Sequence, residues 1–202
     1  MRILPLLAFS AMAASAPLML AGQTAPQHQA PANNEIFGGY SYSFRAYDHT
    51  QDNPVSGGMN GWEASAKFAI PRTRLLGIKV DGSGYYRTDN YAGESFVGYR
   101  PQAYFFLAGP QISLPMGRYT VFADVLVGEG HLNSGDQSIP SLASSFAFSE
   151  AAGGGVDVGL TRRLAWRVGG EFLHSGFSSS DNQIHGYVSS NGRIATGLVV
   201  RF

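Results

Sequence analysis

The sequence predicts an all-β protein in which eight antiparallel strands form one up-and-down barrel. Three observations support this prediction. Polar and apolar side chains alternate along successive segments, which is the period of a strand with two different faces. The seven connections between those segments alternate between long and short, as they do when strands run up and down. An apolar run rich in Leu and Ala opens the chain, and the aromatic residue Phe202 ends it.

Composition narrows the class of protein. Charged residues make up 14% of the 202 residues, against a usual share of about 25%. Gly (26 residues) and aromatic residues (12%) are abundant, which suits a sheet whose outer surface meets lipid. The formal net charge of zero offers no basic field for nucleic acid. The absence of cysteine excludes disulfides, thiolate metal sites and a cysteine nucleophile.

The N-terminal segment is expected to precede the barrel. Arg2 and the apolar run after it are typical of a secretory signal peptide. We predict a signal peptide over residues 1–22 and a flexible linker over 23–34, which is rich in Pro, Ala, Gln and Asn. A transmembrane helix is the alternative, because about 19 apolar residues can span a bilayer. Pro5 and Pro17 interrupt the run, which favours the signal peptide.

The first four predicted strands lie between residues 35 and 114, and three of them have one clearly apolar face. The fourth strand is apolar on both faces. The apolar side chains of the first three are Tyr40, Tyr42 and Phe44, then Trp62, Ala64, Ala66 and Phe68, then Leu76, Ile78 and Val80. The predicted bounds are Glu35–Ala46, Gly61–Ile70, Leu75–Arg87 and Gln102–Leu114.

The last four predicted strands follow the same rule between residues 119 and 202. Gly153–Gly155 lie inside the sixth strand, where glycines mark a bend or close packing more often than a phosphate site. The apolar faces carry Val121, Val125 and Val127, then Val156, Val158 and Leu160, then Leu164, Trp166 and Val168, then Ile194, Leu198 and Val200. The predicted bounds are Tyr119–Gly128, Ser145–Leu160, Leu164–His174 and Gly192–Phe202.

Strand length and connection length both point to a membrane wall. Most predicted strands have about 10–13 residues, whereas a tilted strand crosses a bilayer core in about 9–11 and a soluble strand usually has about 5–6. Short turns at one end and long loops at the other are expected of outer-membrane barrels. The short connections are Pro71–Arg74, Pro115–Arg118 and Thr161–Arg163. The long ones are Tyr47–Asn60, Thr88–Pro101, Glu129–Ser144 and Ser175–Asn191.

Polarity decides between two kinds of barrel. Along each strand, alternate residues form one apolar set and one polar set, here called the two parities. A lipocalin-like soluble barrel turns the apolar parity inward around a ligand, whereas a membrane barrel turns it outward towards lipid. The apolar parity ends in aromatic residues that could form two interfacial girdles. These are Tyr40, Tyr42, Phe44 and Trp62 towards the loops, and Phe68, Trp166 and Phe202 towards the turns. We therefore predict an eight-stranded antiparallel up-and-down transmembrane β-barrel over residues 35–202, surrounded by outer-membrane lipids.

The opposite parity carries ionisable side chains, which fit the inside of a narrow barrel as paired charges. Facing lipid, a mid-depth Lys or Arg would cost about 2–4 kcal/mol. The expected lumen network could gate a narrow water path, or it could simply satisfy buried charges. Its members are Arg45, Glu63, Lys67, Lys79, Asp81, Asp124, Asp157, Arg167, Glu171, Arg193 and Arg201. The expected pairings are Asp157 opposite Arg167, Glu171 diagonal to Arg193 with Phe202 beside Leu164, and Lys67 diagonal to Asp81.

The sequence offers little support for catalysis. Some small outer-membrane barrels modify lipid A, and they need a Ser and a His on one outer face with a carboxylate to orient the His. His174 and Ser175 follow Glu171, but adjacent residues of a strand point to opposite faces. We therefore predict no enzyme, no cofactor and no metal site. The other histidines are His28 in the linker and His49, His131 and His185 in predicted loops.

Four segments of the chain resemble the OmpA-like transmembrane domain and the wider outer-membrane protein β-barrel family: residues 36–42, 153–157, 163–167 and 192–202. The likeness covers residues 35–202. The resemblance implies export, a place in the outer membrane of a Gram-negative cell, and a monomer. It also implies insertion by the barrel assembly machinery, which recognises a last strand ending in an aromatic residue, here Phe202.

Two functions remain open. Polar, Tyr-containing loops without catalytic spacing favour a structural and surface-interaction protein, which supports envelope integrity and adheres through four extracellular loops. The alternative is a narrow channel or a conduit for hydrophobic small molecules, because Phe105, Leu107 and Leu126 are apolar residues of the inner parity. A lipid A-modifying enzyme is the remote alternative.

Overall fold

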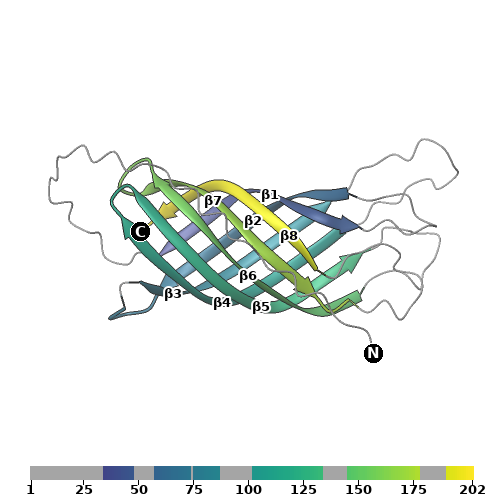
Figure 1. Ribbon diagram of the computed structural model, residues 1–202. Coiled ribbons are helices and arrows are strands. Elements are labelled where there is room, and N and C mark those ends of the chain that lie inside the picture. Colours follow the sequence, from purple (N-terminus) through teal and green to yellow (C-terminus); the bar gives the residue numbers. More distant parts are fainter. Residues whose placement is uncertain (1–33, 48–56, 74, 87–101, 134–144, 178–189) are drawn as a thin grey trace, which may run out of the picture.

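The computed structural model describes residues 34–47, 57–73, 75–86, 102–133, 145–177 and 190–202. Within them the chain forms eight strands that pair in sequence order and close into one antiparallel barrel (Figure 1). The predicted fold class is therefore confirmed. The strands are β1 (Glu35–Tyr47), β2 (Gly57–Ala69), β3 (Leu76–Tyr86), β4 (Gln102–Met116), β5 (Tyr119–Asn133), β6 (Ser145–Gly159), β7 (Leu164–Ser175) and β8 (Ser190–Arg201).

The predicted signal peptide and all of the predicted linker except Asn34 lie outside the described residues. Asn34 itself joins the wall, because its side-chain Oδ1 accepts a hydrogen bond from the Ala69 backbone N–H at 3.1 Å. The described residues include no helix that is long and apolar enough to cross a membrane.

Two strands extend four or more residues beyond the predicted bounds, and β4 continues to Met116, inside the predicted turn at Pro115–Arg118. β2 begins at Gly57 rather than Gly61, and β5 continues to Asn133 rather than Gly128. The added segments are rich in Gly and Asn and therefore resemble loops. They stay in the sheet because Met59 and Leu132 point into the barrel, where both are buried.

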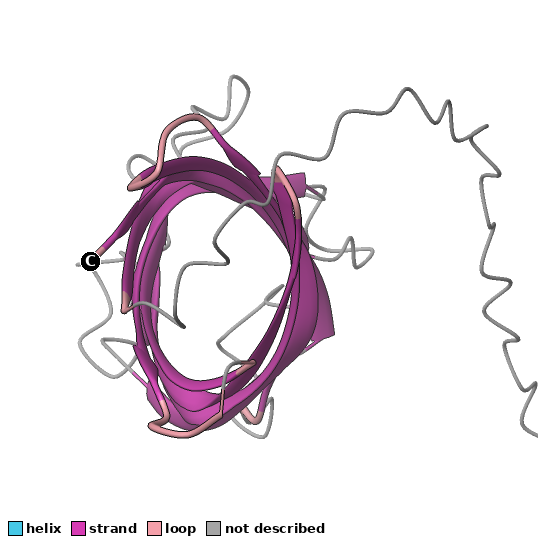
Figure 2. Cartoon of the chain, turned by 90° about the vertical axis from the view of Figure 1, so that its left-hand side faces the viewer, coloured by secondary structure: helices cyan, strands magenta, loops and turns pink. Residues whose placement is uncertain are grey.

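The two faces of the wall have the predicted polarity. Viewed from the end that carries the short turns, the strands form a closed elliptical ring (Figure 2). Most side chains that point away from the ring are apolar, and many are exposed, such as Ile36, Val125 and Trp166. Side chains of the other parity are buried inside it, and they include Lys79 and Arg193. The expected orientation of apolar side chains outward and ionised ones inward is confirmed.

Aromatic side chains lie on the outer surface near both ends of the wall. Towards the loop end, Trp62 Nε1 donates a hydrogen bond to Tyr86 Oη at 3.2 Å, and the Tyr86 ring packs edge-on against Tyr104. Such rings combine an apolar body with a polar tip and suit a membrane interface. Phe68, Trp166 and Phe202, predicted for the turn end, are likewise exposed.

The pairing of β7 with β8 differs from the prediction by two residues. Leu164 lies opposite Val200 rather than Phe202, so Glu171 is directly opposite Arg193 instead of diagonal to it. Phe202 extends past this ladder, where its backbone N–H donates to the Asn34 carbonyl at 3.1 Å. The long connection before β8 sets no register, which explains the error.

The other two predicted register relations are correct. Asp157 lies opposite Arg167 across the β6–β7 turn. Lys67 lies opposite Lys79, which makes it diagonal to Asp81. A tight hairpin transmits its register to the strands on either side, so these relations follow from turns that the sequence identifies.

Candidate functional site

The interior of the barrel is the candidate site, and it has three layers. Nearest the short turns is the turn-end ion cluster: Glu35, Lys67, Asp157, Arg167 and Arg201. Halfway along lies the central ion cluster: Glu63, Lys79, Asp81, Asp124, Glu171 and Arg193. Nearest the loop end is the apolar cluster, which comprises Met59, Tyr85, Ala103, Phe105, Leu107, Leu126, Leu132, Ala151 and Leu173.

Arg167 organises the turn-end ion cluster. Its Nε and Nη2 bind the two carboxylate oxygens of Asp157 at 2.6 and 2.9 Å, and Nη2 also reaches Glu35 Oε2 at 3.0 Å. The guanidinium lies 4.2 Å from the centre of the Phe122 ring, which adds a cation–π contact in a desolvated setting. Bidentate pairing of this kind fixes geometry as well as charge.

Glu35 is a member of this cluster that the sequence analysis missed. It is buried at the start of β1 and accepts contacts from Lys67 at 3.4 Å and Arg201 at 3.3 Å besides Arg167. Glu35 has the same parity as Phe37, which is also buried inside the barrel. Extending the alternation to the first residue of the strand would have identified it.

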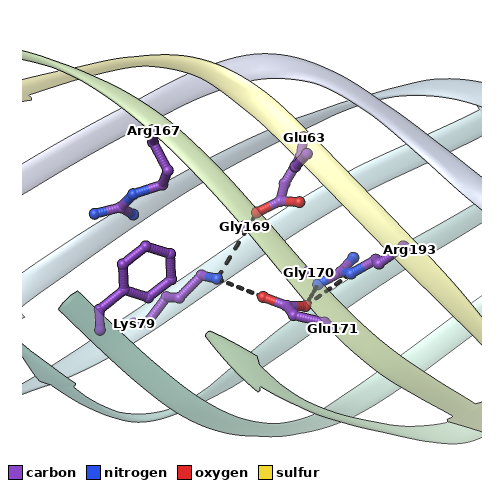
Figure 3. A pocket seen from close by; sticks show the side chains of 9 residues that line it. Glu63, Lys79, Arg167, Gly169, Gly170, Glu171 and Arg193 are labelled. Carbon is purple, nitrogen blue, oxygen red and sulfur yellow. Dashed lines mark hydrogen bonds and ion pairs between the residues drawn. The ribbon is translucent and has the colours of Figure 1, made fainter. Parts of the chain in front are cut away.

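The central ion cluster depends on two cations (Figure 3). Lys79 Nζ contacts Glu171 Oε1 at 2.9 Å, Asp124 Oδ2 at 3.0 Å and Glu63 Oε1 at 3.7 Å. Arg193 binds Glu171 through Nε at 2.7 Å and also through Nη2. The same Nη2 reaches Asp81 Oδ1 at 3.0 Å, and Nη1 donates to Ser83 Oγ at 2.8 Å. Each cation therefore serves several carboxylates from different strands.

Carboxylates outnumber cations in the central ion cluster by four to two. Asp81 Oδ2 and Asp124 Oδ1 are buried and accept no hydrogen bond from the described residues. A buried charge is tolerated only when it is paired and hydrogen-bonded. Because the acids already share their cations, the loss of one cation would leave several carboxylates without compensation.

Side chains of the described strands fill the interior between them. A cavity of about 10 Å³ lies between the two ion clusters and is lined by Phe122, Arg167, Glu63, Lys79, Glu171 and Arg193, among others. That volume holds about one water molecule. Beyond it the apolar cluster packs closely, with Phe105, Leu107 and Leu126 at most 3% exposed. Tyr85 closes this layer against the ions, and its hydroxyl forms a 2.9 Å hydrogen bond with Ser41.

The structure places ten of the eleven predicted lumen charges inside the barrel, whereas the side chain of Arg45 lies outside the described residues. Asp157 with Arg167 and Glu171 with Arg193 form ion pairs. Lys67 pairs with Glu35 rather than with Asp81, although the register makes Asp81 its diagonal neighbour.

Histidine and serine side chains do not form a complete catalytic triad in the described part of the chain. Ser175 is buried inside the barrel, whereas His174 is on the outer face, as the alternation requires. His174 Nδ1 instead forms a 2.8 Å hydrogen bond with Ser190 Oγ of β8. Glu150 lies opposite His174 in the ladder, but no hydrogen bond or ion pair joins these two described residues. A triad needs a carboxylate that orients the imidazole.

One histidine was assigned to the wrong element. His131 lies in β5 rather than in a loop, because that strand continues to Asn133, and its ring is 4.4 Å from the ring of Phe146. His28, His49 and His185 lie outside the described residues. Across the described ranges, His, Asp and Glu side chains form no group of three or more that could hold a metal ion.

Comparison with known proteins identifies the fold. No protein-family model matches the sequence, and no curated protein matches it. Neisserial surface protein A (NspA) is similar in structure, with a TM-score of 0.61 and 14% identity over 84% of this chain and 97% of that one. Ail, the attachment invasion locus protein of Yersinia pestis, was solved in complex with the heparin analogue sucrose octasulfate. It has a TM-score of 0.57 and 16% identity over 85% of this chain and 99% of Ail.

A third similar structure is outer membrane protein H (OprH) from Pseudomonas aeruginosa, with a TM-score of 0.51 and 14% identity over 85% of this chain and 100% of that one. All three are outer-membrane β-barrels. This chain has the same fold, and the predicted resemblance is confirmed at the level of fold.

Proposed function

We propose that the protein is an exported outer-membrane β-barrel with a structural and surface-interaction role. It supports the integrity of the envelope and presents the connections at its loop end to partners outside the cell. The observation that carries this proposal is the polarity of the wall. Apolar side chains cover the outer face of the wall. The ionised side chains on its inner face pair with one another in two ion clusters inside the barrel.

The outer surface supports a place in a membrane. Exposed large hydrophobic residues occur on all eight strands, and Phe106, Phe148 and Phe172 are each more than half exposed. Soluble proteins rarely leave a continuous apolar surface of this extent in water. A belt of apolar side chains flanked by aromatic residues is the arrangement that lipid requires of a membrane barrel.

The path into the membrane is part of the proposal. Residues 1–22 act as the signal peptide, and residues 23–34 form the linker that follows it. Phe202 at the end of the last strand is the aromatic signal for the barrel assembly machinery. The inserted barrel is a monomer, since closure of β1 on β8 leaves no unpaired strand edge.

The packed interior supports an interaction role over a channel or an enzyme. The cavity between the ion clusters holds about one water, and the apolar cluster covers it towards the loop end. The Ser190–His174 pair lacks the oriented carboxylate that acyl transfer needs. The similar Ail structure is that of the attachment invasion locus protein of Yersinia pestis, bound to a heparin analogue, which favours a role at the cell surface.

Cell fractionation tests the membrane part of the proposal. We expect the protein in the outer-membrane fraction, and we expect the unheated sample to migrate faster in gels than the heated one. A closed barrel resists detergent, because all of its strands are paired, and it stays compact until heat unfolds it. A mature protein that is soluble and monomeric without detergent would contradict the proposal.

Replacement of two loop-end connections tests the surface-interaction part. In one variant, residues 134–144 and 178–189 become Gly-Ser linkers of equal length, and the described strands stay unchanged. We expect cells that produce this variant to lose binding to host-cell surfaces while its heat-dependent gel mobility stays that of the parent. The control replaces Thr161 by Ser in a short turn, which should keep binding. Equal binding by the loop variant and the parent would contradict a role for these connections.

A further inference from the structure

The exposed charges of the described residues are divided between the two ends of the barrel. Four exposed arginines lie in the short turns: Arg72 between β2 and β3, Arg118 between β4 and β5, and Arg162 and Arg163 between β6 and β7. The exposed acids are Glu129 and Glu150, both in the half of the wall nearer the loop end. The described turns contain no exposed Asp or Glu, so all of their exposed charges are basic.

No acidic side chain of the described residues pairs with these turn arginines. Arg72, Arg162 and Arg163 form no ion pair with any described residue, and Arg118 donates only to a backbone carbonyl, that of Gly159 at 3.2 Å. The acids of the turn-end ion cluster, Glu35 and Asp157, are buried and already bound by Lys67, Arg167 and Arg201. The four guanidinium groups are therefore available to an external anion.

Three of the turn arginines, Arg118, Arg162 and Arg163, lie beside the edge of the apolar belt. Arg118 precedes Tyr119, which is 51% exposed, and Arg162 and Arg163 lie between Leu160 and Trp166, which are 50% and 43% exposed. At this position an arginine can place its stem along apolar surface and its guanidinium among lipid headgroups. A guanidinium binds a phosphate through two parallel hydrogen bonds, so phosphate is the matching headgroup chemistry.

The backbone at Arg72 is a second observation. Its φ is 73°, a left-handed conformation that glycine adopts freely and that an arginine rarely takes. The corresponding turn between β4 and β5 does use glycine, since Gly117 has a φ of 66°. A side chain at a position that favours glycine points to a role for that side chain.

We propose that Arg72, Arg118, Arg162 and Arg163 form a binding surface for anionic phospholipids in the leaflet at the turn end. The inference rests on the membrane location proposed above. Short turns face the periplasm in outer-membrane barrels, so the leaflet is the inner one. The surface selects lipids with a net negative headgroup, such as phosphatidylglycerol, over zwitterionic lipids.

The two tryptophans of the chain allow a test with a reporter at each end. Trp62 lies towards the loop end and Trp166 towards the turn end. Trp62→Phe leaves Trp166 as the reporter, and its fluorescence is measured in vesicles of phosphatidylcholine with brominated phosphatidylglycerol or brominated phosphatidylcholine as quencher. We expect the anionic lipid to associate roughly fivefold more strongly near Trp166, which is about 1 kcal/mol, the value for one headgroup bound by one arginine. Trp166→Phe, with Trp62 as reporter, should show no such preference.

Neutralisation of the arginines should remove the preference. The four changes Arg72→Gln, Arg118→Gln, Arg162→Gln and Arg163→Gln are combined with Trp62→Phe. In this variant the association constants of brominated phosphatidylglycerol and brominated phosphatidylcholine near Trp166 should become equal, so that their ratio falls to about one. The matched control, Glu129→Gln with Glu150→Gln, should leave the ratio unchanged. Should the arginine variant fail to fold, sodium chloride at high concentration tests the same point on the unaltered arginines, because salt screens exposed charges.

The outcomes separate this inference from the proposed function. Absence of quenching by both brominated lipids would mean that the barrel is not in the bilayer, and the proposed function itself would fail. Equal quenching by both lipids at Trp166 would overturn the lipid surface while leaving the membrane location intact. A preference that survives both the arginine variant and salt would also overturn it.

Discussion

Replacement of Arg193 by methionine is expected to lower the free energy of unfolding by about 3–5 kcal/mol, as the loss of one partner of a buried ion pair does. Arg193 is 2% exposed and contacts Asp81, Glu171 and Ser83. Methionine has similar length but no charge, so the central ion cluster would keep four carboxylates and Lys79 as its one cation. The change is measured by urea unfolding in phospholipid vesicles, followed by tryptophan fluorescence.

Two variants make this measurement specific. In phosphatidylcholine vesicles without anionic lipid, Arg163→Gln removes an exposed arginine and should change the free energy of unfolding by no more than about 0.5 kcal/mol. Glu171→Gln combined with Arg193→Met should cost less than the sum of the single changes, with a coupling of about 0.5–3 kcal/mol, because the two side chains share hydrogen bonds. If Arg193→Met were as mild as Arg163→Gln, the central ion cluster would not be a stabilising network.

Replacement of Gly39 by alanine is expected to weaken the seam that closes the barrel. Gly39 of β1 lies opposite Gly197 of β8. A Cβ added to Gly39 would lie 2.8 Å from the Gly197 Cα and would also overlap the carbonyl oxygen of Thr196. Both obstacles are backbone atoms, which cannot move aside as a flexible side chain does. Overpacking of this kind costs about 1–3 kcal/mol.

The adjacent glycine is a matched control for this prediction. A Cβ added to Gly38 would meet no atom within 4 Å, since that position faces away from the barrel. We expect Gly38→Ala to keep or slightly raise stability, because alanine loses less backbone entropy than glycine on folding. The measurements are urea unfolding and the fraction of protein with heat-modifiable gel mobility. Equal effects of Gly38→Ala and Gly39→Ala on stability would show that the close approach of β1 to β8 at Gly39 does not determine the stability of the barrel.

Glycine also shapes the interior next to Arg167. A Cβ on Gly155 would lie 2.8 Å from Phe122 Cζ and 2.6 Å from the Gly169 Cα. The Phe122 ring needs this space because it lies directly against the Arg167 guanidinium. The sequence predicted a bend or close packing at Gly153–Gly155, but it could not identify the ring that requires the space at Gly155.

Turn chemistry and alternation determined from the sequence alone which segments form the eight strands and which face their side chains take, although not where every strand ends. Thr161 illustrates the local control, since its Oγ1 accepts hydrogen bonds from the backbone N–H groups of Arg163 and Leu164 and holds the β6–β7 turn tight. A tight turn sets register over the next few residues. The Asp157–Arg167 pair could therefore be predicted.

Only the closed barrel determined which charged side chains form ion pairs with one another. Lys79 and Glu171 are 92 residues apart, and Arg193 and Asp81 are 112 apart, on strands that are not neighbours in the sheet. Alternation places each of them inside, but it contains no information about partners across the lumen. Those contacts depend on the tilt of the strands and the β1–β8 register, which are set when the last strand pairs with the first.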